Sequence, residues 1–181
     1  MPNNKYYNES IGFYIEKPDN WDFLPTPWVA NIKNKTAISN DEISHLMQQA
    51  NIPFVYIQKP STRTDMAYPT VQATCRHMAS PTAAQRAQME RLQIQLLQNS
   101  FKDFDLLLSS NSESVSGHPA NYYKAAFSVQ NEHGTTFNCI SEAWTVFSDN
   151  ITYSIGLSGS AANRTDYEND INLIFKSIKI V

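Results

Sequence analysis

The side chains best suited to nucleophilic chemistry are two cysteines, Cys75 and Cys139, and the histidines that could serve as their bases, among them His77. Residues two apart on a strand share a face, so Cys75 and His77 would lie side by side on one strand. A thiol nucleophile also needs an oxyanion-binding motif and a thiolate of lowered pKa, and no such motif accompanies the pair. We therefore predict that neither cysteine is catalytic, and a cysteine-dependent hydrolase is the least favoured alternative.

The histidines and acidic residues do not have the spacing of a metal site. The sequence contains no H-x-x-x-H, H-E-x-x-H or D-x-D-x-D-G pattern, and its five glycines form no run that could cradle a phosphate. Asp166 and Glu168 are expected in the first turn of a helix, where the helix dipole favours negative charge. The sequence thus predicts no metal ligand, no cofactor, no catalytic residue and a protein that is not an enzyme.

The pairing of the two cysteines is left open by the sequence. Cys75 and Cys139 both lie in alternating apolar segments, where an unpaired thiol behaves as a small hydrophobic side chain. A disulfide between neighbouring strands is the alternative in an oxidising compartment, provided that the two Cα atoms come within bonding range.

Length and charge restrict the partners. A chain of 181 residues with 41% hydrophobic residues predicts one domain, residues 1–181, with a substantial core. A net charge of -3 does not supply the basic surface that nucleic acid needs, and no apolar run approaches the roughly 20 residues of a membrane-spanning helix. We expect a protein partner or a small apolar ligand, no nucleic acid and no membrane span.

The first residues leave two localisations open. Strand-like sequence begins at Tyr6, with no basic, then apolar, then small-residue leader before it. Met1 is either the native start of a cytoplasmic protein or a replacement for the leader of an exported one.

Hydrophobic periodicity predicts an α+β domain. Alternating apolar residues favour strands at Tyr7–Lys17, Phe54–Gln58, Val71–His77, Phe104–Ser110, Asn121–Gln130, Thr135–Phe147, Asn150–Leu157 and Ser177–Val181. Capping residues and amphipathic spacing favour helices that begin near Ser39, Ser80 and Thr165. The longest helix, from Ser80 to about Phe101, should turn Met89, Leu92, Leu96 and Leu97 inward. The last four strands before the final helix should form an antiparallel meander with one face packed against helices.

An irregular, proline-containing excursion begins at Asp22 and precedes the helix near Ser39. We expect an inserted loop and helix at about residues 22–51, with the loop as a candidate functional segment. Aromatic residues on strands and loops are either packing residues or part of a binding surface, and Trp28 and Tyr122 are among them.

Three local signatures resemble the PsbP and DcrB group of proteins, which includes the Ran-binding Mog protein. The strand Ile11-Gly12-Phe13-Tyr14-Ile15 before Pro18 and Trp21 resembles the group's opening. The turn Val115-Ser116-Gly117-His118-Pro119-Ala120 before Tyr122 and Tyr123 resembles its central turn, and Tyr167 through Ile180 resembles its closing helix and strand. The resemblance implies an antiparallel β-sheet sandwiched by helices (α/β/α) and a binding protein or assembly factor without a shared catalytic site.

These observations favour a non-enzymatic binding or assembly module of PsbP/DcrB type, exported in a bacterium and acting through a protein or small-ligand contact. The candidate binding residues are Trp28, His118 and Tyr122. The alternative is a cytoplasmic chaperone or adaptor of a secretion system, which would present a groove for an apolar helix.

Overall fold

Two antiparallel sheets and their helices make up the computed structural model, which describes residues 4–25, 52–60, 67–130 and 134–181. In chain order the elements are β1 (Lys5–Asn8), the 3-10 helix η1 (Glu9–Ile11), β2 (Phe13–Glu16), β3 (Asp22–Phe23), β4 (Val55–Gln58), β5 (Thr70–His77), α3 (Ala83–Ser100), β6 (Lys102–Val115), β7 (His118–Gln130), β8 (Thr136–Phe147), β9 (Ile151–Ser160), the 3-10 helix η2 (Ala161–Asp166), α4 (Glu168–Ser177) and β10 (Lys179–Ile180). The helix expected near Ser39, and most of the expected insertion at 22–51, lie outside these ranges.

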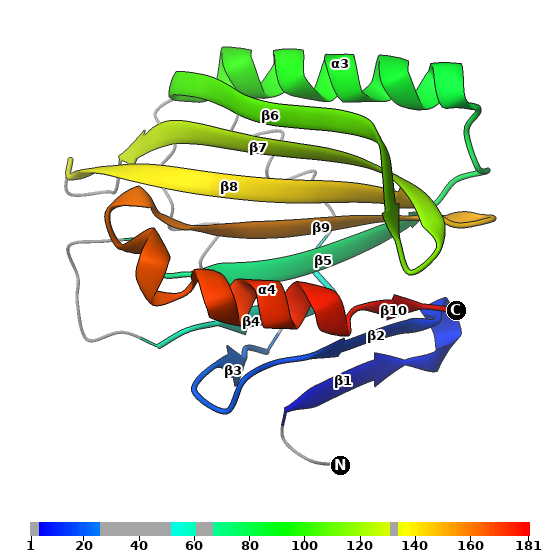
Figure 1. The fold of residues 1–181 in the computed structure, drawn as a ribbon, viewed down its shortest axis with the longest axis horizontal. Coiled ribbons are helices and arrows are strands. Elements are labelled where there is room, and N and C mark those ends of the chain that lie inside the picture. The colour runs from blue at the N-terminus through cyan, green and yellow to red at the C-terminus, as the bar shows by residue number, and fades with distance from the viewer. Residues whose placement is uncertain (1–3, 26–51, 61–66, 131–133) are drawn as a thin grey trace.

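The larger sheet has seven strands in the order β3-β4-β5-β9-β8-β7-β6, and every neighbouring pair is antiparallel. Strands β6 to β9 follow one another as a meander, as the sequence predicted (Figure 1). Strand β5 then pairs with β9, so the end of the meander lies beside an earlier part of the chain.

The smaller sheet has three strands in the order β1-β2-β10. The single strand expected over Tyr7–Lys17 is wrong, because the chain reverses through η1 and forms a hairpin of β1 and β2 instead. Gly12 ends η1 with a φ of 61°, a left-handed conformation that glycine adopts at little cost. Its carbonyl accepts a hydrogen bond from the amide of Val181 at 3.0 Å, which holds the C-terminus against this hairpin.

The hydrophobic core lies between one face of the larger sheet, helix α4 and the smaller sheet. Phe13 of β2 stacks on Tyr153 of β9 with ring centroids 5.8 Å apart. Phe175 of α4 stacks on Trp144 of β8 at 4.0 Å. The largest fully buried side chains are Trp21, Tyr153, Tyr167, Phe13, Phe147, Ile15, Ile57, Ile155, Leu157, Ile171 and Ile174. The two sheets therefore share one core.

A polar contact joins the start of α4 to Trp21 inside this core. The indole Nε1 donates to Oδ2 of Asp170 at 2.9 Å, and Lys59 Nζ lies 2.8 Å from the same oxygen. Burial raises the pKa of the Asp170 carboxyl, but the hydrogen bonds from Lys59 and Trp21 outweigh it and hold this pKa below its ordinary value. The carboxylate is thus kept ionised where it binds the indole.

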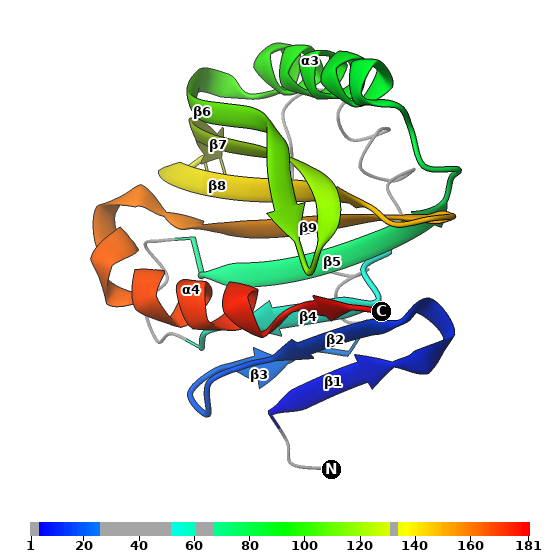
Figure 2. The ribbon, with the colours of Figure 1, turned by 45° about the vertical axis from the view of Figure 1, so that its right-hand side comes forward.

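Helix α3 lies beside β6, on the opposite side of the larger sheet from α4 (Figure 2). The alternation of strand residues establishes this arrangement, since Ile155 faces the core while its neighbour Ser154 lines a cavity together with residues of α3. Helices thus cover both faces, which confirms the expected α+β sandwich.

Two details of α3 differ from the sequence prediction. Its N-cap is Thr82 instead of Ser80, because Thr82 and Gln85 form a reciprocal capping box. Leu92 and Leu96, expected to face inward, are 57% and 48% exposed. The helix rests on its other side, where Glu90 is buried, so an apolar stripe remains uncovered among the described residues.

A disulfide between Cys75 and Cys139 is not formed, although the sequence left it open. Strand β9 separates β5 from β8 in the sheet. Cys75 pairs in register with Tyr153 and Cys139 with Ser160, near opposite ends of β9. The two thiols therefore lie beyond the Cα separation of about 7 Å that a disulfide can span.

The other expected helix cap is also wrong. Thr165 and Glu168 were predicted to cap the last helix reciprocally, but α4 begins after Tyr167 without a side-chain cap. Glu168 instead interacts with Arg164, with Nε and Oε1 3.4 Å apart.

Replacing Gly159 with alanine should destabilise the protein. A Cβ atom at this position would lie 2.5 Å from the hydroxyl oxygen of Tyr167 and 2.7 Å from its Cζ atom. Overpacking of this kind costs about 1–3 kcal/mol of unfolding free energy. Gly156→Ala is the matched control on the same strand, since its Cβ would meet only the Gln72 side chain, at 3.6 Å. Equilibrium denaturation should show a lower unfolding free energy for Gly159→Ala alone. Equal unfolding free energies of the two variants would contradict this packing.

Candidate functional site

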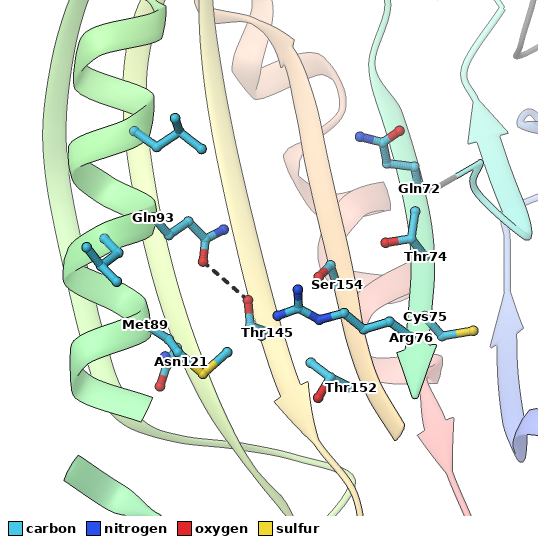
Figure 3. Close-up of a pocket in the computed structure, with 12 residues that line it drawn as sticks. Gln72, Thr74, Cys75, Arg76, Met89, Gln93, Asn121, Thr145, Thr152 and Ser154 are labelled. Carbon is cyan, nitrogen blue, oxygen red and sulfur yellow. Dashed lines mark hydrogen bonds between the residues drawn. The ribbon is translucent and has the colours of Figure 1, made fainter. Parts of the chain in front are cut away.

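A cavity of about 530 Å³ lies between α3 and the outer face of the larger sheet, and we call it the α3 cavity (Figure 3). Its volume is within the range of sites that hold small ligands. The described residues that line it are Gln72, Thr74, Cys75, Arg76, Met89, Leu92, Gln93, Leu96, Asn121, Thr145, Thr152 and Ser154.

The α3 cavity has an apolar wall and a polar floor. The wall comes from α3, which contributes Met89, Leu92 and Leu96. The floor comes from β5, β7, β8 and β9, whose residues on this face are hydroxyl- or amide-bearing for the most part, for example Thr152 and Ser154. Because strand residues alternate, the same strands supply apolar side chains to the core and polar side chains to the cavity.

Two floor residues are buried and have an oxygen atom without a partner. Asn121 is 4% exposed, and its Nδ2 donates to the carbonyl of Arg86 at 2.8 Å, whereas its Oδ1 has no hydrogen-bond partner. Thr152 is 1% exposed, and its Oγ1 also has none. Figure 3 shows both residues at the same end of the cavity. A buried polar atom left unpaired costs about 1–3 kcal/mol, so the pair marks a place where another molecule could bind.

Arg76 is the one charged side chain among the described residues that line the α3 cavity. It is exposed, and in Figure 3 its side chain extends toward Thr145. Thr145 itself donates to Oε1 of Gln93 at 3.4 Å, which joins β8 to α3 across the cavity. The guanidinium gives the cavity a positive charge and five hydrogen-bond donors.

A second cavity, of about 520 Å³, opens near β4 and we call it the β4 cavity. Its described lining residues are Tyr56, Gln58, Ala67, Tyr68, Thr70, Phe127, Val129, Cys139, Ser158 and Gly159. In the described part of the chain, no three His, Cys, Asp or Glu side chains lie close enough together to bind a metal ion, in either cavity or elsewhere.

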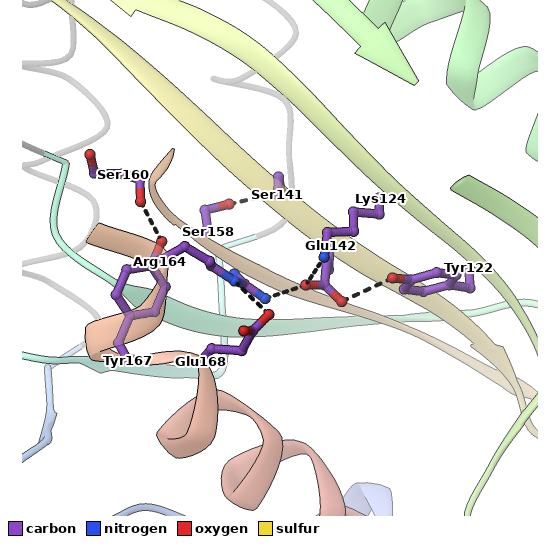
Figure 4. A network of polar contacts seen from close by, with 9 residues as sticks. All are labelled: Tyr122, Lys124, Ser141, Glu142, Ser158, Ser160, Arg164, Tyr167 and Glu168. Carbon is purple, nitrogen blue, oxygen red and sulfur yellow. Dashed lines mark hydrogen bonds and ion pairs between the residues drawn. The ribbon is translucent and has the colours of Figure 1, made fainter. Parts of the chain in front are cut away.

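On the core side of the sheet, Glu142 is the centre of a network of charged and polar contacts (Figure 4). It accepts a hydrogen bond from the hydroxyl of Tyr122 at 2.9 Å and forms ion pairs with Lys124 and Arg164. Arg164 also meets Glu168, so the network connects β7 and β8 to the start of α4. The partners in these contacts all belong to the chain itself, which is typical of a structural role, although Arg164 Nη1 is buried without a hydrogen-bond partner.

Of the binding residues expected from the sequence, Tyr122 and His118 are described, and neither lines a cavity. Tyr122 belongs to the Glu142 network and stacks on Trp144 at 4.7 Å, and its pKa is raised by burial and by the Glu142 carboxylate. His118 is half-buried and is the first residue of β7, where it pairs in register with Val115 of β6. It is not among the described residues that line either cavity. Trp28 lies outside the described residues.

Sequence reasoning missed Arg76, Asn121, Thr145 and Thr152. A signal was present, because the residues between the apolar positions of β5 and β9 are hydroxyl-bearing or amide-bearing side chains. The local pattern of these strands does not show that α3 lies over this face and closes a cavity with it.

Neither thiol has the environment of a nucleophile. Burial raises the pKa of Cys139 to about 11 and also raises that of Cys75. A thiolate nucleophile requires a shift in the opposite direction.

No model of a known protein family matches this sequence, and neither does the sequence of any curated protein. Solved structures do match. LpqN of Mycobacterium tuberculosis, described as involved in cell envelope biogenesis, has a TM-score of 0.55 and 12% identity, over 100% of this chain and 86% of that one. Cyanobacterial PsbP of Synechocystis has a TM-score of 0.52 and 9% identity, over 100% and 95%. A protein of unknown function from Pseudomonas aeruginosa has a TM-score of 0.52 and 14% identity, over 67% and 78%.

At these identities the likeness establishes the fold. The chain has a PsbP-like α+β fold, as the three sequence signatures implied. Its structural neighbours have envelope-related or unknown functions. None of the described helices is both long enough and apolar enough to cross a membrane.

Replacing Thr152 with valine should stabilise the free protein. The substitution removes an unpartnered, buried hydroxyl and keeps the branched shape of the side chain, so the unfolding free energy should rise by about 1 kcal/mol. The exposed strand residue Thr136 provides the control, and Thr136→Val should change stability little. Loss of stability in Thr152→Val, measured by equilibrium denaturation, would show that the hydroxyl is already satisfied.

Proposed function

We propose that this chain is a non-catalytic binding module of PsbP type that holds a small ligand in the α3 cavity. The observation that carries the proposal is the pair of buried, unpartnered oxygen atoms, Asn121 Oδ1 and Thr152 Oγ1, in the lining of a cavity of about 530 Å³. A structure that leaves such atoms unpaired gains free energy when a ligand satisfies them.

The chemistry of the lining supports binding over bond-breaking. Its described residues are hydroxyls, amides, aliphatic side chains, one guanidinium and the thiol of Cys75, whose pKa burial raises. Such groups position a ligand but supply no carboxylate or imidazole as a general base. A hydrolase that used Cys75 or Cys139 is disfavoured on the same grounds.

We further propose that the protein is exported and acts in the envelope of a bacterium. The support is the fold it shares with LpqN, whose described involvement is in cell envelope biogenesis. The alternative is a cytoplasmic adaptor of a secretion system, which would use the exposed leucines of α3 to receive an apolar helix of another protein.

Binding to the α3 cavity can be tested with the fluorescent probe 1-anilinonaphthalene-8-sulfonate, an apolar anion. Leu92→Gln should weaken probe binding by roughly tenfold, because it places an amide in the apolar wall. Leu173 of α4 is a matched control, since it is 62% exposed against 57% for Leu92 and is not in the described lining. Leu173→Gln should leave binding unchanged, and both variants should retain their melting temperatures.

Equal probe binding by the two leucine variants would contradict a ligand site in the α3 cavity.

Export can be tested by fractionating cells that express the full-length gene from its own start. The protein should appear in the extracytoplasmic fraction, with a control enzyme retained in the cytoplasm. A protein found only with the cytoplasmic control would contradict export and favour the adaptor.

A further inference from the structure

The unpartnered atoms in the α3 cavity specify what a ligand must donate. Asn121 directs Nδ2 at the carbonyl of Arg86, so the atom left over is Oδ1, which can only accept a hydrogen bond. Thr152 Oγ1 can accept or donate. A ligand that satisfies this end of the cavity therefore carries an O–H or N–H group.

The charge of the lining selects between these donors. An ammonium group would need a carboxylate nearby, and the described lining residues include none. A neutral hydroxyl donates its one proton to Asn121 Oδ1 or to Thr152 Oγ1 without bringing a second positive charge close to Arg76. The donor that fits is thus a neutral one, of which a hydroxyl group is the simplest.

Arg76 specifies the second group. A guanidinium presents paired N–H donors that match the two oxygens of a carboxylate. Arg76 extends toward Thr145 across the floor, so an anionic group bound to it would lie within the cavity beside the polar residues (Figure 3).

The wall from α3 specifies the remainder of the ligand. Met89, Leu92 and Leu96 lie on successive turns and form a strip about 10 Å long, from the helical rise of about 1.5 Å per residue. None of the described lining residues is aromatic, so the cavity lacks the stacking surface that a base or other flat ring prefers. An aliphatic chain suits this strip.

We propose that the α3 cavity binds an aliphatic carboxylate that carries a hydroxyl group near its acid end. The carboxylate pairs with Arg76, the hydroxyl donates to Thr152, the register partner of Arg76 on β9, and the alkyl chain lies along Met89, Leu92 and Leu96. This inference rests on the proposed function, because it names the ligand class of the same cavity.

Calorimetric titration of the intact protein with 3-hydroxydecanoate and decanoate tests the hydroxyl. Decanoate should bind roughly tenfold more weakly, because it leaves the buried oxygens unpaired. In Thr152→Val this preference should shrink severalfold, while decanoate binding stays the same. Shortening the chain should weaken binding by roughly fourfold per methylene removed.

Arg76→Gln tests the charge. It should weaken the binding of 3-hydroxydecanoate by roughly tenfold and leave the binding of the uncharged methyl ester of the same acid unchanged. Arg91 is an exposed arginine of α3 that is not in the described lining, so Arg91→Gln is the matched control and should change neither affinity.

The outcomes separate this inference from the proposed function. Equal binding of 3-hydroxydecanoate and decanoate, or unchanged 3-hydroxydecanoate binding by Arg76→Gln, overturns the ligand class, even where the fluorescent probe still depends on Leu92. If neither acid binds and Leu92→Gln leaves the affinity for the fluorescent probe unchanged, the α3 cavity is not a ligand site and the proposed function is overturned.

Discussion

The register of the seven-stranded sheet is the constraint on which the rest of the structure depends. On β9, Tyr153 and Ile155 point into the core while Thr152 and Ser154 point into the α3 cavity. A slip of one residue would exchange these two sets, burying hydroxyls in the core and exposing the largest apolar side chains. One pairing pattern therefore determines both the core and the cavity, and the energy of burying the core face maintains the geometry of the polar face.

The polar side chains on the two faces of the larger sheet differ in their hydrogen-bond partners. On the core side, Glu142 and Asp170 are each held by several donors, and these contacts attach α4 and Trp21 to the sheet. On the cavity side, Asn121 and Thr152 are also buried, but each has an oxygen atom without a hydrogen-bond partner. Buried atoms without a partner also occur on Arg86 and, on the core side, on Arg164, so the functional argument rests on the cavity that Asn121 and Thr152 line together with their unpaired oxygens.

Local patterns predicted the elements that depend on local interactions. The sequence predicted β5, the meander from β6 to β9 and the closing helix, because alternation and amphipathic spacing are local features of the sequence. The hairpin of β1 and β2 was missed, since apolar alternation continues across the short helix η1 and the left-handed Gly12 that together reverse the chain. The stripe of α3 was misassigned because Met89, Leu92 and Leu96 have the spacing of a core face, although the helix rests on another side.

The sequence by itself determined that this is an α+β chain with an antiparallel sheet, because these follow from residue type and periodicity, and its three local signatures implied the PsbP-like fold. The tertiary structure alone decided that α3 covers the polar face, that β9 separates Cys75 from Cys139, and that Arg76, Asn121 and Thr152 meet in one cavity. The physical reason is that these residues lie on different strands, β5, β7 and β9. Their proximity arises from strand order and register, which long-range pairing sets and which no local pattern records.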